Sequence, residues 1–130
     1  MKNKLDNNLP IYQQIVNDIL RTIANGELEP GEKVAPVRLM ALYYGVNPNT
    51  AQKALEKLVD MGFMFTESTS GRFVTEDAAA IEGLKSKLSD KIVGDFIQDM
   101  KGLGIEEHDV PKYVNEYIGR LEINGKNTGN

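Results

Sequence analysis

The sequence predicts an α+β fold that is mostly α, with three short helices, a β-hairpin and then two further helices. Three observations predict it. Isoleucines recur every four residues from Ile11 to Ile23, Asn47-Pro48 stands directly before an apolar stripe of helical spacing, and two short β-rich runs flank a Gly-containing loop at 68–71. With 130 residues, of which 41% are hydrophobic, the chain is long enough for one domain with an appendage.

The first predicted helix opens at Pro10 and ends at Asn25-Gly26. A turn over 29–32 follows, in which Pro and Gly suit a type II geometry, and Lys33-Val34 is a candidate for a very short strand. A second short helix begins at Pro36 and stops at Gly45, where a left-handed cap favours glycine.

The third predicted helix has the clearest boundaries, with Asn47 as N-cap, Pro48 at the first helical position and Gly62 after its end. Two strands, 63–67 and 72–75, then form a hairpin with a four-residue loop. Helix, helix, helix, hairpin is the order of a winged helix-turn-helix.

Two amphipathic helices complete the chain, one from Asp77 to the glycines 102 and 104, the other over 109–122. A pair of this size is too small for a core of its own, so we expect its apolar face to meet a second copy. The predicted dimerisation residues are Ile92, Phe96, Met100, Tyr113, Tyr117 and Leu121. The predicted organisation is a flexible N-terminus (1–8), the winged helix-turn-helix (9–76), a short two-helix dimerisation hairpin (77–123) and a disordered tail (124–130).

Composition excludes several classes of function. There is no cysteine, hence no disulfide, thiol nucleophile or Cys-ligated metal, and the single His meets carboxylates only at residues 106–109, where acidic side chains suit a helix start. Phosphate-binding and dinucleotide-binding glycine motifs are missing, so we expect no enzyme, no cofactor and no metal. No apolar run approaches the ~20 residues of a membrane span, and no signal peptide opens the chain, which predicts a cytoplasmic protein.

The formal net charge of −4 argues against a globally basic nucleic-acid binder, so any DNA contact must come from a local patch. The start of the third helix supplies one, because the second helix of a helix-turn-helix presents its N-terminal residues to base edges in the major groove. The candidate DNA-binding residues there are Asn47, Asn49, Thr50, Gln52, Lys53 and Lys57. The alternative is that Asn47 only caps the helix and that the two lysines are its solvated face.

Several motifs between residues 9 and 75 occur together in this order. They are Leu9-Pro10-Ile11-Tyr12-Gln13-Gln14-Ile15, the run from Gly26 to Ala41, the run from Gly45 to Ala51, Ala54-Leu55, Gly62-Phe63 and Gly71-Arg72-Phe73-Val74. In these motifs the chain resembles the DNA-binding domain of the GntR family of bacterial transcription regulators. The short C-terminal part and the form Asn47-Pro48-Asn49-Thr50 resemble the YtrA-like subfamily.

The resemblance implies a homodimeric repressor that binds double-stranded operator DNA of a nearby operon, often one for an ABC transporter. It adds Arg38 as a phosphate or base contact and Ser70, Gly71 and Arg72 at the wing, where Arg72 is able to enter the minor groove or to remain a solvated hairpin charge. Three departures from the family pattern are the missing serine in Val34-Ala35-Pro36-Val37-Arg38, Leu39 in place of a Glu, and Thr69 in place of the first wing glycine.

Two questions stay open at this point. A winged helix with net negative charge also fits a protein-interaction module without specific DNA binding. The sequence shows no evident small-molecule effector site, since two C-terminal helices leave little room for a pocket of ~300 Å³ or more. Any effector would then lie at the dimer interface or against the DNA-binding domain.

Overall fold

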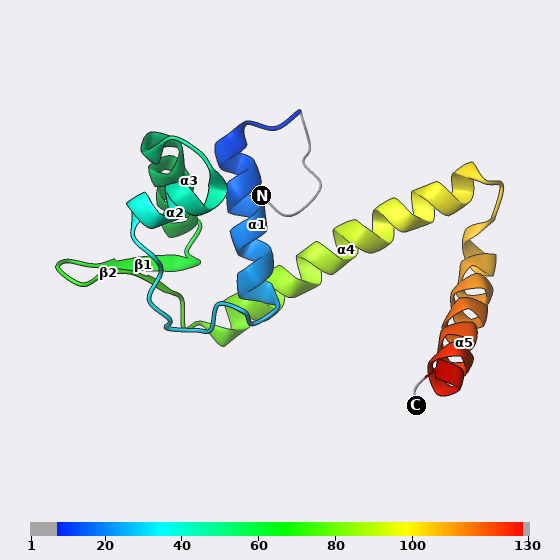
Figure 1. The fold of residues 1–130 in the computed structure, drawn as a ribbon. Coiled ribbons are helices and arrows are strands. Elements are labelled where there is room, and N and C mark those ends of the chain that lie inside the picture. The colour runs from blue at the N-terminus through cyan, green and yellow to red at the C-terminus, as the bar shows by residue number, and fades with distance from the viewer. Residues whose placement is uncertain (1–7, 129–130) are drawn as a thin grey trace. The chain divides into compact units, whose positions relative to one another are not determined.

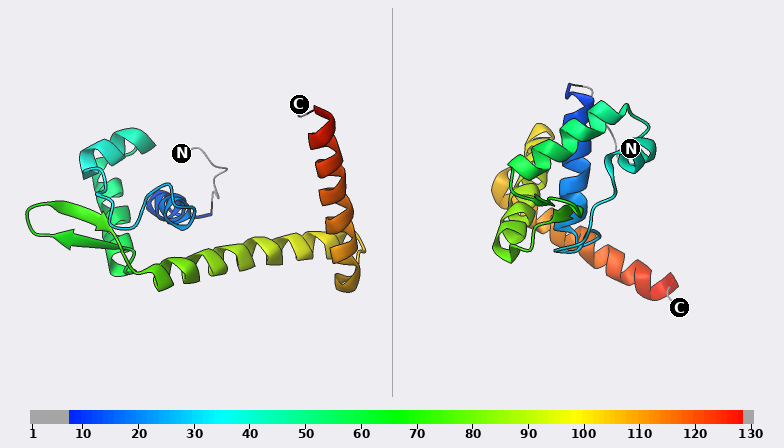
Figure 2. Two further views of the ribbon diagram at one scale, coloured as in Figure 1. Left: turned by 90° about the horizontal axis from the view of Figure 1, so that it is seen from below. Right: turned by 90° about the vertical axis from the view of Figure 1, so that its left-hand side faces the viewer.

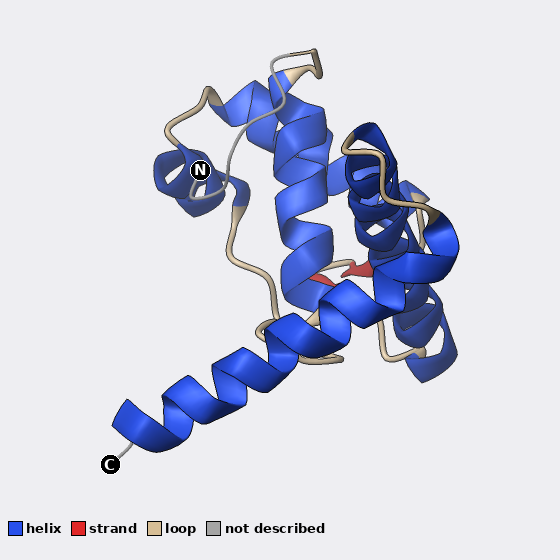
Figure 3. Cartoon of the chain, turned by 90° about the vertical axis from the view of Figure 1, so that its right-hand side faces the viewer, coloured by secondary structure: helices blue, strands red, loops and turns tan. Residues whose placement is uncertain are grey.

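The computed structural model describes residues 8–128, and the order of elements is the predicted one (Figure 1). Its elements are α1 (Ile11–Ala24), α2 (Val37–Tyr44), α3 (Pro48–Asp60), β1 (Met64–Glu67), β2 (Gly71–Val74), α4 (Ala78–Gly102), the 3-10 turn η1 (Glu107–Asp109) and α5 (Val110–Thr128). Helices dominate, and the two short strands form the one sheet of the described part (Figure 3). The predicted α+β, mostly α class is confirmed.

The chain divides into two compact units, residues 1–88 and 89–130. Helix α4 is continuous through the boundary and contributes to both units (Figure 2). Of the segments predicted to be flexible or disordered, residues 1–7 and 129–130 lie outside the described residues.

The core of the first unit is built chiefly by α1 and α3. Ile15, Ile19 and Ile23 lie on one face of α1 and are each 1% exposed, as the four-residue spacing predicts. They meet Leu55 and Leu58 of α3, which are equally buried. This packing fixes α3 against α1 and leaves the opposite face of α3 in water.

The turn between α2 and α3 follows from its residue types. Gly45 adopts φ 67°, and the Val46 N–H donates to the Ala41 carbonyl at 3.0 Å, which closes α2 with a left-handed cap. The Asn47 side chain accepts from the Asn49 N–H at 2.7 Å and caps α3, with Pro48 at its first position. The predicted boundaries of both helices are confirmed.

The hairpin loop is one residue shorter than predicted. Glu67 pairs with Gly71, so three residues, 68–70, connect the strands and Gly71 opens β2. Gly71 has φ 106°, which suits the left-handed position that ends a three-residue hairpin loop. The predicted strand at Lys33-Val34 is a single β-bridge from Lys33 to Phe73 on the free side of β2.

The first part of α4 belongs to the first unit. The Asp77 carboxylate accepts from the Ala80 N–H at 3.0 Å at the start of this helix. Leu84 is 7% exposed, and Ile81 and Leu88 pack against the core of the first unit. The first unit thus ends at Leu88 and not at residue 76, because an unbroken apolar stripe does not reveal where its packing partner changes.

The second unit consists of the rest of α4, η1 and α5. Gly104, with φ 85°, lies in the loop after α4, as predicted. Helix α5 extends to Thr128, so the prediction of a helix ending at Glu122 and a disordered tail from residue 124 was wrong for 124–128. Asn and Gly lower helix propensity by at most ~1 kcal/mol each, which weakens a helix without ending it. In the described part, no helix combines the length and the apolar character needed to cross a membrane.

Candidate nucleic-acid interface

The predicted base-reading residues lie at the start of α3, and the structure separates their roles. The Asn47 side-chain oxygen accepts a hydrogen bond from the Asn49 N–H, so Asn47 caps the helix. Asn49 itself is exposed, and its side chain has no hydrogen-bond partner among residues 8–128. Of these two asparagines, only Asn49 has a side-chain oxygen free to meet a base edge, where Asn recognises adenine.

Lys53 is held by a residue of another helix. Its Nζ lies 4.2 Å from the ring centroid of Tyr12 in α1, at the distance of a cation–π contact. Tyr12, Asn49, Thr50 and Lys53 line a common hollow of about 300 Å³, together with Ile11. The start of α1 thereby adjoins the start of α3 and sets the direction of the lysine.

The next residues along α3 differ in their freedom. The Gln52 amide donates to the Glu56 carboxylate at 2.7 Å, which ties up one of the two groups that Gln uses to read adenine. Lys57 is exposed and makes no ion pair with any residue in the described range. Its ammonium group is therefore available to a charged partner such as a phosphate.

A second group of predicted residues gathers where the wing meets the start of α2. Ser70, Gly71 and Arg72 line a hollow of about 300 Å³ together with Lys33 and the segment 34–37. The Lys33 side chain lies against the wing. A Cβ added to Gly71 would lie 3.4 Å from the Cε of Lys33. Lys33 and Arg72 thus bring two cations to one hollow.

Arg72 is half-buried, unlike a fully solvated hairpin charge. Its Nε is enclosed and finds no hydrogen-bond acceptor within the described residues. Arg38, one residue after the segment that lines the hollow, is exposed. Pro36 is the N-cap residue of α2 and forms no side-chain hydrogen bond there, as the missing serine implied. The hollow therefore combines unpaired donors with a helix start, which is an arrangement that suits a phosphate.

Sequence reasoning missed Tyr12 and Lys33 as neighbours of the site. Tyr12 stood in one of the family-like motifs, but nothing in its local sequence showed that α1 begins beside α3. Lys33 lay in a predicted strand, and only its bridge to Phe73 brings it to the wing. Both became visible through contacts between distant parts of the sequence.

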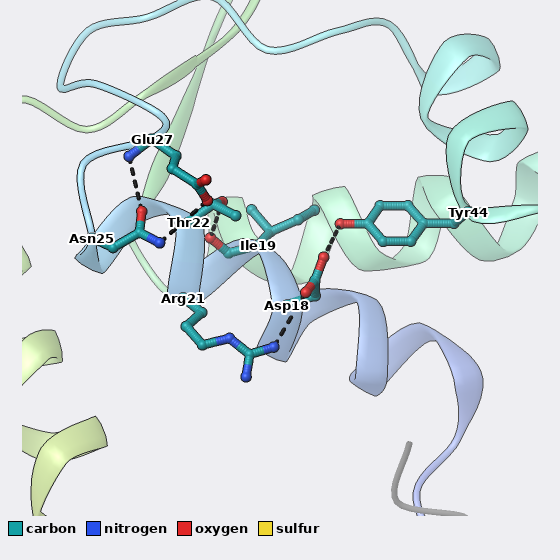
Figure 4. A network of polar contacts seen from close by, with 7 residues as sticks. All are labelled: Asp18, Ile19, Arg21, Thr22, Asn25, Glu27 and Tyr44. Atoms are coloured by element: carbon teal, nitrogen blue, oxygen red, sulfur yellow. Dashed lines mark hydrogen bonds and ion pairs between the residues drawn. The ribbon is translucent and has the colours of Figure 1, made fainter. Parts of the chain in front are cut away.

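A hydrogen bond between Tyr44 and Asp18 joins α2 to α1 (Figure 4). The Tyr44 hydroxyl donates to Oδ2 of Asp18 at 2.7 Å, and Oδ1 of Asp18 accepts from Arg21 at 3.2 Å. Burial raises the pKa of the Tyr44 hydroxyl above its ordinary value, and the hydrogen bond to Asp18 adds to the shift. Tyr44 thus remains a proton donor and keeps α2, and with it the turn into α3, in place.

The second unit presents an apolar groove of about 490 Å³. Four of the predicted dimerisation residues, Phe96, Met100, Tyr113 and Tyr117, line it with Val114 and Arg120. The other two, Ile92 and Leu121, do not line it and are 67% and 51% exposed. The unit therefore leaves a set of large apolar side chains without a packing partner of its own.

The acidic segment around His108 is open to solvent. The imidazole lies 3.7 Å from the Glu106 carboxylate and 3.6 Å from that of Asp109, and all three side chains are more than half exposed. Within the part of the chain that the structure describes, no group of three ligating side chains is arranged to hold a metal ion.

Comparison with known proteins gives consistent matches. The sequence model described as "Bacterial regulatory proteins, gntR family" matches residues 11–74. The chain is 34% identical over 110 residues to the uncharacterized HTH-type transcriptional regulator YhcF of Bacillus subtilis, covering 85% of this chain and 91% of that protein. It is 28% identical over 120 residues to the HTH-type transcriptional repressor YtrA of the same organism, covering 91% and 92% of the two chains.

Solved structures agree with these sequence matches. A GntR family transcriptional regulator from Listeria monocytogenes superposes with a TM-score of 0.76 at 34% identity, covering 86% of this chain and 98% of that one. The DNA-binding domain of AraR in complex with operator ORR3 matches with a TM-score of 0.50 at 27% identity, covering 58% of this chain and 88% of that one.

Proposed function

The chain belongs to the gntR family of bacterial regulatory proteins, and from this we propose that it is a homodimeric repressor that binds a specific operator in the DNA of a nearby operon. It acts in the cytoplasm, where that DNA lies, and carries out no catalysis. Its similarity to the repressor YtrA over nearly the whole length of both chains supports the YtrA-like subfamily. The resemblance to that subfamily implies an operon for an ABC transporter as the target.

The observation that carries the proposal is the state of the polar side chains on α3 and the wing. The side chains of Asn49 and Lys57 make no hydrogen bond or ion pair with another described residue, and Arg72 has an unpaired Nε at the wing hollow. Unpaired polar groups at the start of a recognition helix and at the wing match the two places where a winged helix meets the major groove and its flanks. AraR, which shares this fold, is seen bound to an operator through its DNA-binding domain.

The apolar groove of the second unit supports the homodimer. Phe96, Met100, Tyr113 and Tyr117 expose apolar surface that a second copy would cover symmetrically. Phe96→Glu is expected to convert the dimer to a monomer in sedimentation equilibrium, whereas Glu82→Gln in the same helix leaves the dimer intact. An unchanged molecular mass of Phe96→Glu would contradict this interface.

The DNA-binding proposal is tested by fluorescence anisotropy of the purified full chain with its own upstream promoter DNA and a scrambled duplex, each at two salt concentrations. We expect tight binding to the promoter with two chains per site, and a loss of affinity with salt that reflects the phosphate contacts. Equal affinity for both duplexes, or no salt-dependent binding to either, would overturn the proposal.

A pair of matched variants locates the interface. Arg72→Ala at the wing and Lys112→Ala on α5 each remove one positive charge, so they alter the global field equally. We expect Arg72→Ala to weaken promoter binding and to reduce the slope of log affinity against log salt by about 1, with Lys112→Ala close to the parent chain. The same loss in both would mean that only net charge matters.

A further inference from the structure

A cleft on the first unit lies between α1 and α2 and shares only Ala35 with the wing hollow described above. It encloses about 400 Å³, which is within the range of small-molecule sites. The segment 27–28 after α1 and Ala35 before α2 complete its walls. All of these elements belong to the first unit, so the cleft needs neither DNA nor a second copy to form.

The walls of the cleft are mainly apolar. Ile19, Leu28 and Met40 form its inner part, and Leu39 and Tyr43 stand at its opening with 46% and 56% of their surfaces exposed. Covering such exposed apolar side chains with the apolar part of a ligand is favourable, because it removes apolar surface from water. Leu39 is also the position where the family pattern has Glu, so this apolar opening distinguishes the chain from the usual pattern.

The charge of the cleft is of one sign. Asp18 and Glu27 contribute carboxylates, and no lysine or arginine is among the residues that line it in the described structure. Arg21 stands outside the lining and neutralises Asp18 through Oδ1, while Tyr44 occupies Oδ2. Among the described residues, the Glu27 carboxylate accepts from the neutral Asn25 amide, at 3.2 Å, and forms no ion pair, so its negative charge is not compensated there (Figure 4).

Glu27 is also held in position. Its backbone N–H donates to the Asn25 side chain at 2.9 Å, and the next N–H, of Leu28, donates to the Thr22 carbonyl at 3.0 Å. These bonds fix the loop after α1 against the end of that helix. An ion bound there would therefore meet a carboxylate that is already ordered, which lowers the entropic cost of binding.

We propose that this cleft binds a small organic cation with an apolar body. The charged nitrogen meets Glu27, and the hydrocarbon part lies against Leu39, Met40 and Tyr43. The Tyr43 ring adds an aromatic face, which attracts cations. Organic anions of the same size are excluded by Glu27.

The test uses three probes of the same length that differ in charge: 4-phenylbutylamine, which is protonated at neutral pH, 4-phenylbutanol and 4-phenylbutyrate. Binding to the full chain is followed by the shifts of backbone amide signals in nuclear magnetic resonance spectra without DNA. We expect saturable shifts with the amine, confined to residues 18–28 and 35–44, weaker binding of the alcohol, and none of the carboxylate. Because no DNA is present, failure here leaves the operator proposal untouched.

Two matched variants separate the role of Glu27 from net charge. Glu27→Gln keeps the side-chain shape and is expected to lower the affinity for the amine about fivefold, which is the upper end for the loss of an exposed ion pair. Glu29→Gln removes the same charge two residues away, outside the cleft lining, and should bind like the parent chain. Leu39→Ala should lower the affinity for the amine and for the alcohol by similar factors. Equal binding of all three probes, equal binding to both Gln variants, or no binding of the amine would each overturn the proposal.

Discussion

The Tyr44 hydroxyl donates a hydrogen bond to the Asp18 carboxylate at 2.7 Å and thereby joins α2 to α1. Tyr44 is 8% exposed and the Asp18 side chain 13%, so the bond is shielded from water. Tyr44 is the last residue of α2 and directly precedes the Gly45 turn that leads into α3. The bond therefore holds the end of α2 on α1, the same helix on which α3 packs through Leu55 and Leu58.

Tyr44→Phe is expected to lower the free energy of unfolding by about 1–2 kcal/mol, because a shielded hydrogen bond to a charged acceptor is lost. Urea denaturation at one fixed protein concentration measures the change, since a dimer's stability depends on concentration. Ser68→Ala, which removes a hydroxyl from an exposed residue of the hairpin loop, is the control and should remain within about 0.5 kcal/mol of the parent chain.

The raised pKa of Tyr44 predicts that the free energy of unfolding depends on pH in the alkaline range. Its pKa is raised in the folded state, so above the unfolded tyrosine pKa of about 10 the unfolded chain releases a proton that the folded chain keeps. This contribution to stability is complete below pH 10 and falls as the pH rises further. Between pH 10 and 11 the parent chain should lose up to about 1.4 kcal/mol more than Tyr44→Phe. Parallel profiles of the two proteins would contradict the shift.

Asn47→Ala is expected to cost about 1 kcal/mol of unfolding free energy, because the Asn49 N–H loses the acceptor that caps α3. Asn47→Asp restores an acceptor and places a negative charge at the helix start, where it is favourable, so its stability should match the parent chain. Thermal unfolding followed by circular dichroism compares the three. If Asn47→Ala were as stable as Asn47→Asp, the cap would contribute nothing.

Asn49→Ala and Lys57→Ala are expected to affect DNA binding in different ways. Asn49 stands at the start of the recognition helix with a free amide, so its loss should change the preferred base at one operator position at a cost of about 1–3 kcal/mol. Lys57 contacts phosphate in this assignment, so its loss should weaken all duplexes alike. Anisotropy with operators substituted at single base pairs distinguishes the two. Equal losses on operator and random DNA for both variants would rule out these roles.

Two glycine substitutions should act in opposite directions. Gly45→Ala places a Cβ at φ 67°, which costs about 1–2 kcal/mol even though no atom lies within 4 Å of the added carbon. Gly83 lies inside α4 with equally open surroundings, so Gly83→Ala should stabilise by up to about 1 kcal/mol. Urea denaturation of both variants checks the signs. A stabilising Gly45→Ala would show that the turn relaxes without strain.

The sequence by itself determined where most elements of the first unit begin and end. Pro10, Asn47-Pro48, Gly45 and Gly62 act through φ preferences and local hydrogen bonds, which depend on neighbouring residues only, and the structure places the boundaries of α1, α2 and α3 at these positions. The four-residue spacing in α1 likewise determined its buried face. The hairpin was placed correctly but its loop was given one residue too many, because pairing of Gly71 with Glu67 is a property of the register.

The tertiary structure decided which of the predicted site residues are free to act. Residue type and position made Gln52, Lys53, Asn49 and Lys57 candidates. Contacts with Glu56 and Tyr12 engage the first two and leave the side chains of the others unpaired among the described residues. It also brought Lys33 to the wing and moved the start of α4 into the first unit. Such assignments depend on which surfaces meet in space. The spacing of apolar residues along a helix indicates which face is buried, but not which helix or strand packs on that face.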